Sequence, residues 1–191
     1  MTISAAVRQA RAHPDVVDRL AGVRPGSRLD QLRRLRPAAR EQTQRTHDLL
    51  FGPQAGGWVG RQDRLAIATY VAALHRADLV TDHYAQLLGS LEPHWVAPIR
   101  DEGTRDPVAG PGPVLSGGLR RLLGERTSAA LTYAHLTVLR PDGARPDDLA
   151  ALTAAGWNRQ GIVTITQTIG FLSYQIRLVH GLHLLAEDGA A

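Results

Sequence analysis

Four side chains able to take part in catalysis or ligand binding lie in one short stretch of the sequence, LHRADLVTDHY (residues 74–84). Within nine positions it holds His75, Asp78, Asp82 and His83. A histidine titrates near neutral pH and can act as a general base, and carboxylates and imidazoles together can hold a divalent metal. The stretch is therefore the first candidate for an active site, or for the remnant of one.

We expect these side chains to lie near the end of a long helix over residues 61–89. Residues at steps of three and four predict one apolar face: they are Leu65, Ala68, Ala72, His75 and Leu79. His83 would continue this face by one turn. Adjacent residues on a helix point about 100° apart, so Asp82 is a poor partner for His83, whereas Asp78 and Asp82 are neighbours.

Each candidate also has a structural interpretation. His75 fits a hydrogen-bonded core histidine, and the aspartates beside Arg76 fit a helix surface; we prefer this interpretation for both. For His83 the catalytic and structural interpretations balance. A metal site formed by His75, Asp78 and Asp82, with or without His83 or His135, is the least favoured alternative. We therefore expect no bound metal and no cofactor.

The composition limits the chemistry that the chain can perform. The 191 residues include no cysteine, which excludes disulfides, thiolate metal ligands and dithiol redox cycling in this chain. No run is apolar enough for a signal peptide or a membrane span, so we expect a cytoplasmic protein. All 22 basic residues are arginine, and the net charge is only +4. The densest group is Arg33, Arg34, Arg36 and Arg40, which we interpret as a solvated helix face rather than a nucleic-acid surface.

The periodicity along the chain predicts an all-α fold. Helices are expected over residues 4–22 (one or two, the second starting at Pro14 and Asp15), 37–51, 61–89, 119–139, 146–155 and 158–186. Asn158 suits the N-cap of the last helix, which is apolar enough to be buried on most sides, in the core or in a subunit interface. We expect a single domain over residues 1–191. Its parts are an N-terminal extension (1–57), first core helices (58–102), a Gly/Pro-rich connector (103–118) and a similar second half (119–191).

Three segments carry a family resemblance. Residues 60–88, GRQDRLAIATYVAALHRADLVTDHYAQLL, resemble the core of the carboxymuconolactone decarboxylase (CMD) and alkylhydroperoxidase-D superfamily. Residues 154–185 look like later helices of its peroxidase-related members, with a Gly-containing turn before an aromatic-x-x-Arg segment, here Tyr174 to Arg177. Residues 37–51, PAAREQTQRTHDLLF, are further similar to the CMD-domain branch. The resemblance implies an AhpD-like helical bundle of two similar halves.

The same resemblance rules out the best-known activity. Peroxidase members carry a Glu, a Cys-x-x-Cys pair and a following His. A gap-free alignment on His83 puts Arg76 and Leu79 at the cysteine positions and Arg64 at the glutamate position. Without sulfur the peroxide-reducing cycle cannot run.

Arg177 stands alone on an otherwise apolar helix. A buried guanidinium needs a carboxylate, a phosphate or several carbonyl groups. A structural ion pair with an aspartate of the 61–89 helix is the preferred interpretation. The alternative is that Arg177 binds an acidic substrate, helped by Arg76 or Tyr174.

These observations lead to ranked hypotheses. The first is a cysteine-free, non-peroxidase homo-oligomer, a dimer or larger, that binds a small molecule or pairs with a cysteine-bearing relative. The second is a decarboxylase-like or lyase-like enzyme that uses His83 as general acid and base on a small acidic ligand. Weaker alternatives are peroxidase-related activity supported by a partner's thiols and recognition of acidic partners by the arginine group. We expect neither a membrane nor a nucleic acid as partner.

Overall fold

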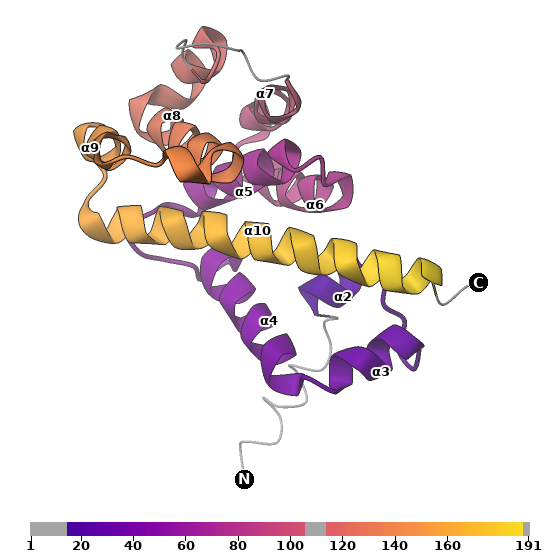
Figure 1. Ribbon diagram of the computed structural model, residues 1–191. Helices are drawn as coiled ribbons and strands as arrows, with labels where there is room; N and C mark the ends of the chain where they lie inside the picture. Colours follow the sequence, from indigo (N-terminus) through magenta and orange to yellow (C-terminus); the bar gives the residue numbers. More distant parts are fainter. Residues whose placement is uncertain (1–14, 106–113, 189–191) are drawn as a thin grey trace. The chain divides into compact units, whose positions relative to one another are not determined.

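A computed structural model describes residues 15–105 and 114–188. In these ranges the chain is helical and contains no β-strand, which confirms the all-α class. The helices in chain order are α2 (Val16–Leu20), α3 (Arg28–Arg34), α4 (Pro37–Phe51), α5 (Arg61–Leu74), α6 (Asp78–Gly89), α7 (Pro93–Thr104), α8 (Gly117–Leu139), the 3-10 turn η1 (Pro141–Gly143), α9 (Pro146–Ala154) and α10 (Arg159–Asp188) (Figure 1).

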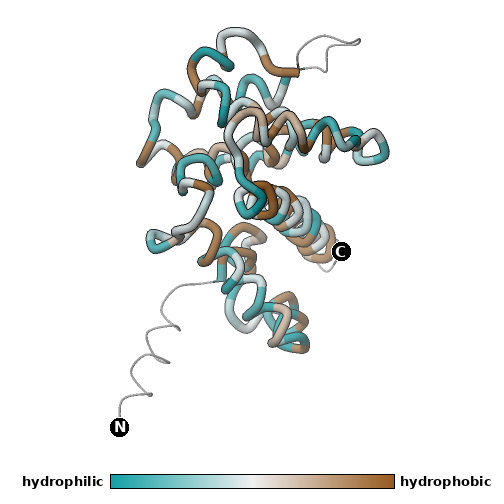
Figure 2. Tube along the Cα trace, turned by 90° about the vertical axis from the view of Figure 1, so that its left-hand side faces the viewer, coloured by the Kyte–Doolittle hydropathy of each residue, from teal (hydrophilic) through white to brown (hydrophobic). Residues whose placement is uncertain are grey.

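The chain divides into two compact units, residues 1–48 with 177–191, and residues 49–176. Helical segments expected over residues 4–14, and the part of the expected connector at 106–113, lie outside the described residues. Within single helices hydrophobic and hydrophilic residues follow one another, as amphipathic helices require (Figure 2). No described helix is both long and apolar enough to cross a membrane.

In the first unit, an ion-pair network joins α2 and α3. Asp15 caps α2, and its Oδ1 accepts hydrogen bonds from the backbone N–H groups of Val17 and Asp18 at 2.9 and 3.0 Å. Arg33 of α3 is only 8% exposed and donates to Asp15 at 2.8 Å and to Asp18 at 2.9 Å. The expectation that the arginine group forms a solvated face is therefore wrong for Arg33. Its charge is buried because two carboxylates, fifteen and eighteen residues earlier, receive it.

The network extends to α4 through the other arginines. Arg40 pairs with Asp18 and, at 3.7 Å, with Asp30. Arg34 pairs with Asp30 at 2.9 Å. The hydrogen bonds that Asp30 accepts from Arg34 and from the Gly26 N–H, together with the charge of Arg40, hold the pKa of Asp30 below its usual value. Only Arg36 of the group is exposed without a part in these ion pairs.

In the second unit, α5 is the central helix. It packs against α6, α7 and α8, and every residue from Arg64 to Ala73 is buried. The α7 backbone comes especially close: a Cβ at Gly103 would lie 2.5 Å from the Ala73 Cβ and 3.2 Å from the Tyr70 carbonyl oxygen. Glycine at 103 therefore permits the α5–α7 contact.

The expected single helix over residues 61–89 is wrong. It breaks at residues 75–77 into α5 and α6, and Arg76 takes a left-handed conformation with φ of 55°. The apolar face does not continue across the break, because Leu79 is 56% exposed. No glycine or proline marks the break, so periodicity alone did not reveal it.

Two later helices also depart from the simple pattern. Gly124, with φ of 74°, kinks α8 into two helical segments. The α10 helix starts as expected, with Asn158 Oδ1 accepting from Gly161 N–H at 2.8 Å. Within the single chain one face of α10 is open to solvent, since Val163 and Tyr174 on this face are 55% and 47% exposed. Burial of this face in a subunit interface stays a prediction.

Candidate functional site

The structure distributes the LHRADLVTDHY side chains over a helix end, a turn and a helix start. His75 is the C-cap of α5, and Arg76 in the turn is exposed. Asp78 begins α6 and is exposed. Asp82 is also exposed, and Arg100 of α7 engages its carboxylate at 2.6 Å. Both aspartates thus lie on the exposed surface of α6, and Asp82 forms an exposed ion pair with α7.

His83 lies beside a buried polar pair. Its ring is half-buried and meets the Tyr84 ring edge-on at a centroid distance of 4.8 Å. The Tyr84 hydroxyl donates to Gln175 Oε1 at 2.7 Å, and both side chains are fully buried. Sequence reasoning missed Gln175, although a single amide at a core-facing position of an apolar helix could have indicated it.

The buried arginine of the second unit is Arg64. It is 2% exposed, and it donates to the carbonyl oxygens of Ala55 at 2.6 Å and Gly56 at 2.9 Å. Burial, followed by the nearby charge of Arg61, lowers the pKa of Arg64.

The premise that Arg177 is buried is wrong, since its side chain is exposed. Binding of an acidic substrate by Arg177, Arg76 or Tyr174 stays a prediction.

A second polar pair, formed by buried Tyr70 and half-buried His135, joins α5 to α8. The Tyr70 hydroxyl lies 3.0 Å from His135 Nδ1. Burial, followed by the charge of Glu102, raises the pKa of Tyr70, while burial, followed by the charge of Arg140, lowers that of His135. Both groups are therefore neutral near pH 7. Throughout residues 15–105 and 114–188 no three histidine, aspartate or glutamate side chains gather so as to hold a metal ion.

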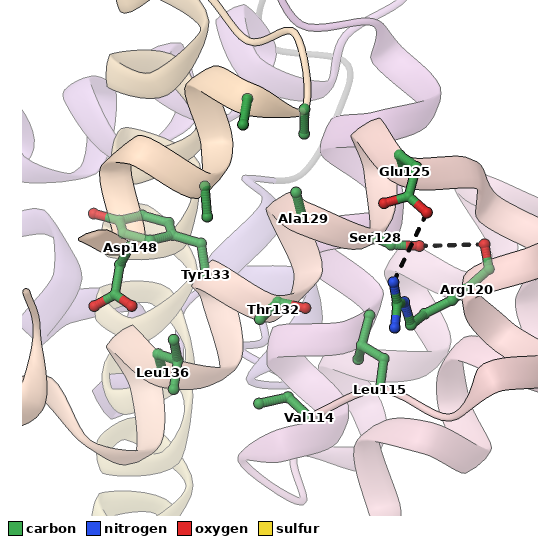
Figure 3. A pocket seen from close by; sticks show the side chains of 13 residues that line it. Val114, Leu115, Arg120, Glu125, Ser128, Ala129, Thr132, Tyr133, Leu136 and Asp148 are labelled. Carbon is green, nitrogen blue, oxygen red and sulfur yellow. Dashed lines mark hydrogen bonds and ion pairs between the residues drawn. The ribbon is translucent and has the colours of Figure 1, made fainter. Parts of the chain in front are cut away.

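A cavity of the second unit lies between α8 and α9. We call it the α8–α9 pocket; its volume is about 480 Å³ (Figure 3). Small and branched apolar side chains form most of its wall: Val114, Leu115, Ala129, Leu136, Ala151, Ala154 and Ala155. A volume of this size suits a small organic molecule.

Polar groups occupy both ends of the α8–α9 pocket. In Figure 3, Arg120, Glu125 and Ser128 lie at one end, and Tyr133 and Asp148 at the other. The lining Thr132 adds a further hydroxyl. An apolar wall with polar groups at its ends binds the body of a ligand by burial and orients it by hydrogen bonds.

The charge at one end is only loosely held. Arg120 approaches Glu125 at 3.8 Å, and their side chains are 47% and 85% exposed. Such an exposed pair contributes little, so Arg120 can exchange its partner for a ligand anion. At the other end Asp148 already accepts the Arg145 N–H at 2.8 Å as part of the α9 capping box.

None of the six residues that the sequence predicted as site residues lines this pocket. Alanine-rich walls give no signal in a single sequence, because alanine is also common throughout ordinary helices.

Neither a comparison with known protein families nor a search among curated proteins finds a significant match to this chain.

Proposed function

We propose that this protein binds a small organic acid with an apolar body in the α8–α9 pocket and has no thiol peroxidase activity of its own. The observation that carries the proposal is the pocket itself: an apolar wall around about 480 Å³ with Arg120 at one end. The ligand carboxylate would take the place of Glu125 on Arg120, and hydroxyl groups such as that of Thr132 would orient the ligand.

The family resemblance supports a proposal about the fold and the relatives of this protein. We propose that the chain is a cysteine-free relative of the CMD and alkylhydroperoxidase-D superfamily with an AhpD-like arrangement of helices. The absence of cysteine then leaves ligand binding, or work beside a cysteine-bearing relative, as its role.

A pair of fluorescent probes tests the pocket. 8-Anilinonaphthalene-1-sulfonate carries a negative charge, and N-phenyl-1-naphthylamine has nearly the same shape without it. We expect both to bind the wild type. Ala129→Trp, which fills the pocket, should abolish both signals, whereas Ala97→Trp on the exposed surface of α7 should leave them unchanged.

Arg120→Gln separates charge from shape. It should weaken binding of the sulfonate probe by about tenfold, the value of one charge-assisted hydrogen bond, and leave the neutral probe unaffected. If Ala129→Trp binds both probes like the wild type, the α8–α9 pocket is not the binding site and the proposal fails.

His83 supports a second candidate, a non-redox enzyme acting on an acidic substrate. The observation in its favour is a half-buried imidazole beside the buried Tyr84–Gln175 pair. Native mass spectrometry distinguishes the two candidates. A bound small molecule that is lost in His83→Ala but kept in Arg120→Gln would favour the enzyme and contradict binding at Arg120.

We also propose that the protein forms a dimer or larger homo-oligomer through α10. Val163 and Tyr174 are exposed and lie eleven residues apart, about three helical turns, on one face. Tyr174→Glu should therefore shift the native mass toward the monomer. An unchanged mass, or a monomeric wild type, would exclude this face as the interface.

A further inference from the structure

We propose that Glu102 and Arg105, at the end of α7, are positioning residues that set the ligand affinity of the α8–α9 pocket. They do not line this pocket. They hold residues 114–116, which form part of its wall and lead into α8. The inference rests on the proposed function, because it concerns the affinity of that same pocket.

Both charged side chains bond to the backbone of this segment. Glu102 is only 6% exposed, and its Oε1 accepts hydrogen bonds from the Ser116 N–H at 2.9 Å and from the Arg105 guanidinium. Arg105 Nη2 also donates to the Val114 carbonyl oxygen at 3.2 Å. The ion pair thus clamps two backbone groups, one on each side of Leu115.

The clamped residues matter to the pocket in two ways. Val114 and Leu115 line it, and Leu115 is 1% exposed, so any shift of the segment changes the wall. Ser116 is the N-cap of α8, with its Oγ accepting from the Leu119 N–H at 3.3 Å. The same segment therefore sets where α8 begins and where it presents Arg120.

The clamp is attached to a fixed point. Gly103, next to Glu102, packs so closely on Ala73 and Tyr70 of α5 that even a methyl group would not fit. Glu102 is consequently held by the centre of the second unit. The Glu102 carboxylate therefore fixes residues 114–116 relative to α5. Because Val114 and Leu115 line the pocket, it fixes this part of the pocket wall as well.

The clamp can be altered without opening the core. Glu102, Arg105 and Ser116 line a separate hollow of about 460 Å³, and the Arg105 side chain is 40% exposed. A substitution there meets this open space instead of packed side chains. We therefore expect the variants below to fold.

The test uses Glu102→Gln, which keeps the shape and an acceptor oxygen but removes the charge, and Arg105→Gln. The control is Arg100→Gln, which lies on α7 like Glu102 and breaks the exposed pair with Asp82 of α6. Both clamp variants should bind the charged and the neutral naphthalene probes about tenfold more weakly, because the wall has moved. The control should bind both like the wild type. This pattern differs from that of Arg120→Gln, which affects only the charged probe.

Hydrogen exchange decides the inference independently of any ligand. The clamp variants should show faster amide exchange in a peptide covering residues 114–119, and Arg100→Gln should not. A wild type that binds neither probe would defeat the proposed function, while the exchange result would still decide the role of the clamp. Unchanged amide exchange in both clamp variants would overturn the positioning role of Glu102 and Arg105.

Discussion

Replacing Arg33 by methionine tests the buried ion-pair network most directly. The substitution keeps most of the side-chain volume but removes the charge. Arg33 is 8% exposed and donates to Asp15 and Asp18, which are themselves 7% and 6% exposed. Removing one partner of a buried ion pair costs about 3–5 kcal/mol, because the remaining charges stay buried without compensation.

The structure places the expected loss at the lower end of this range. Asp18 keeps its contact with Arg40, and Asp15 keeps the two N–H groups of the α2 cap. We therefore expect Arg33→Met to lower the free energy of unfolding by about 3 kcal/mol. Urea unfolding followed by far-UV circular dichroism measures it.

The matched control is Arg36→Met, a change of the same kind at an exposed position three residues along. It should alter stability by no more than about 0.5 kcal/mol. Equal losses in both variants, or a loss below about 1 kcal/mol for Arg33→Met, would refute the idea that the network stabilises the first unit. The arginine group would then be open again to interpretation as a surface for acidic partners.

Two further predictions concern packing and pH. Gly103→Ala should lower the thermal stability, because overpacking against Ala73 costs about 1–3 kcal/mol and exceeds the helix-propensity gain of about 1 kcal/mol. The control is Gly118→Ala, where a Cβ would meet no atom within 4 Å, and it should not destabilise the protein. Burial lowers the pKa of His47 and of His135 in the folded state, so the unfolded chain binds more protons and stability should fall as pH drops below about 6.5. Stability measured from about pH 7 to 5.5 should fall less steeply in His135→Gln, and a flat wild-type profile would contradict the shifts.

The helical class could be predicted from the sequence because it rests on local periodicity. The starts of α2 and α10 were also predictable, since Asp15 and Asn158 act through hydrogen bonds to residues two or three positions away. The break between α5 and α6 was not. Arg76 adopts a conformation that glycine usually supplies, so the signal that normally marks such a turn is absent.

The candidate site was harder to predict because it depends on tertiary contacts. The sequence predicted a solvated Arg33 within a dense arginine group and a buried Arg177 alone on an apolar helix. The structure shows the reverse, because two distant aspartates bury Arg33 and the Arg177 side chain is exposed. The clamp is similarly invisible, since Glu102 and Ser116 are fourteen residues apart. The histidines and aspartates of residues 74–84 predicted a site there, whereas the α8–α9 pocket is lined chiefly by alanine, valine and leucine side chains.

The alanines of the α8–α9 pocket also bear on how the protein can evolve. Ala151 and Ala154 are exposed parts of its wall, outside the hydrophobic core. Exchanging either for serine, valine or leucine would change the room for a ligand by one side chain without disturbing the packing beneath. Selection could therefore retune the preferred ligand in single mutational steps, while Gly103, Glu102 and the α5 core remain under constraint.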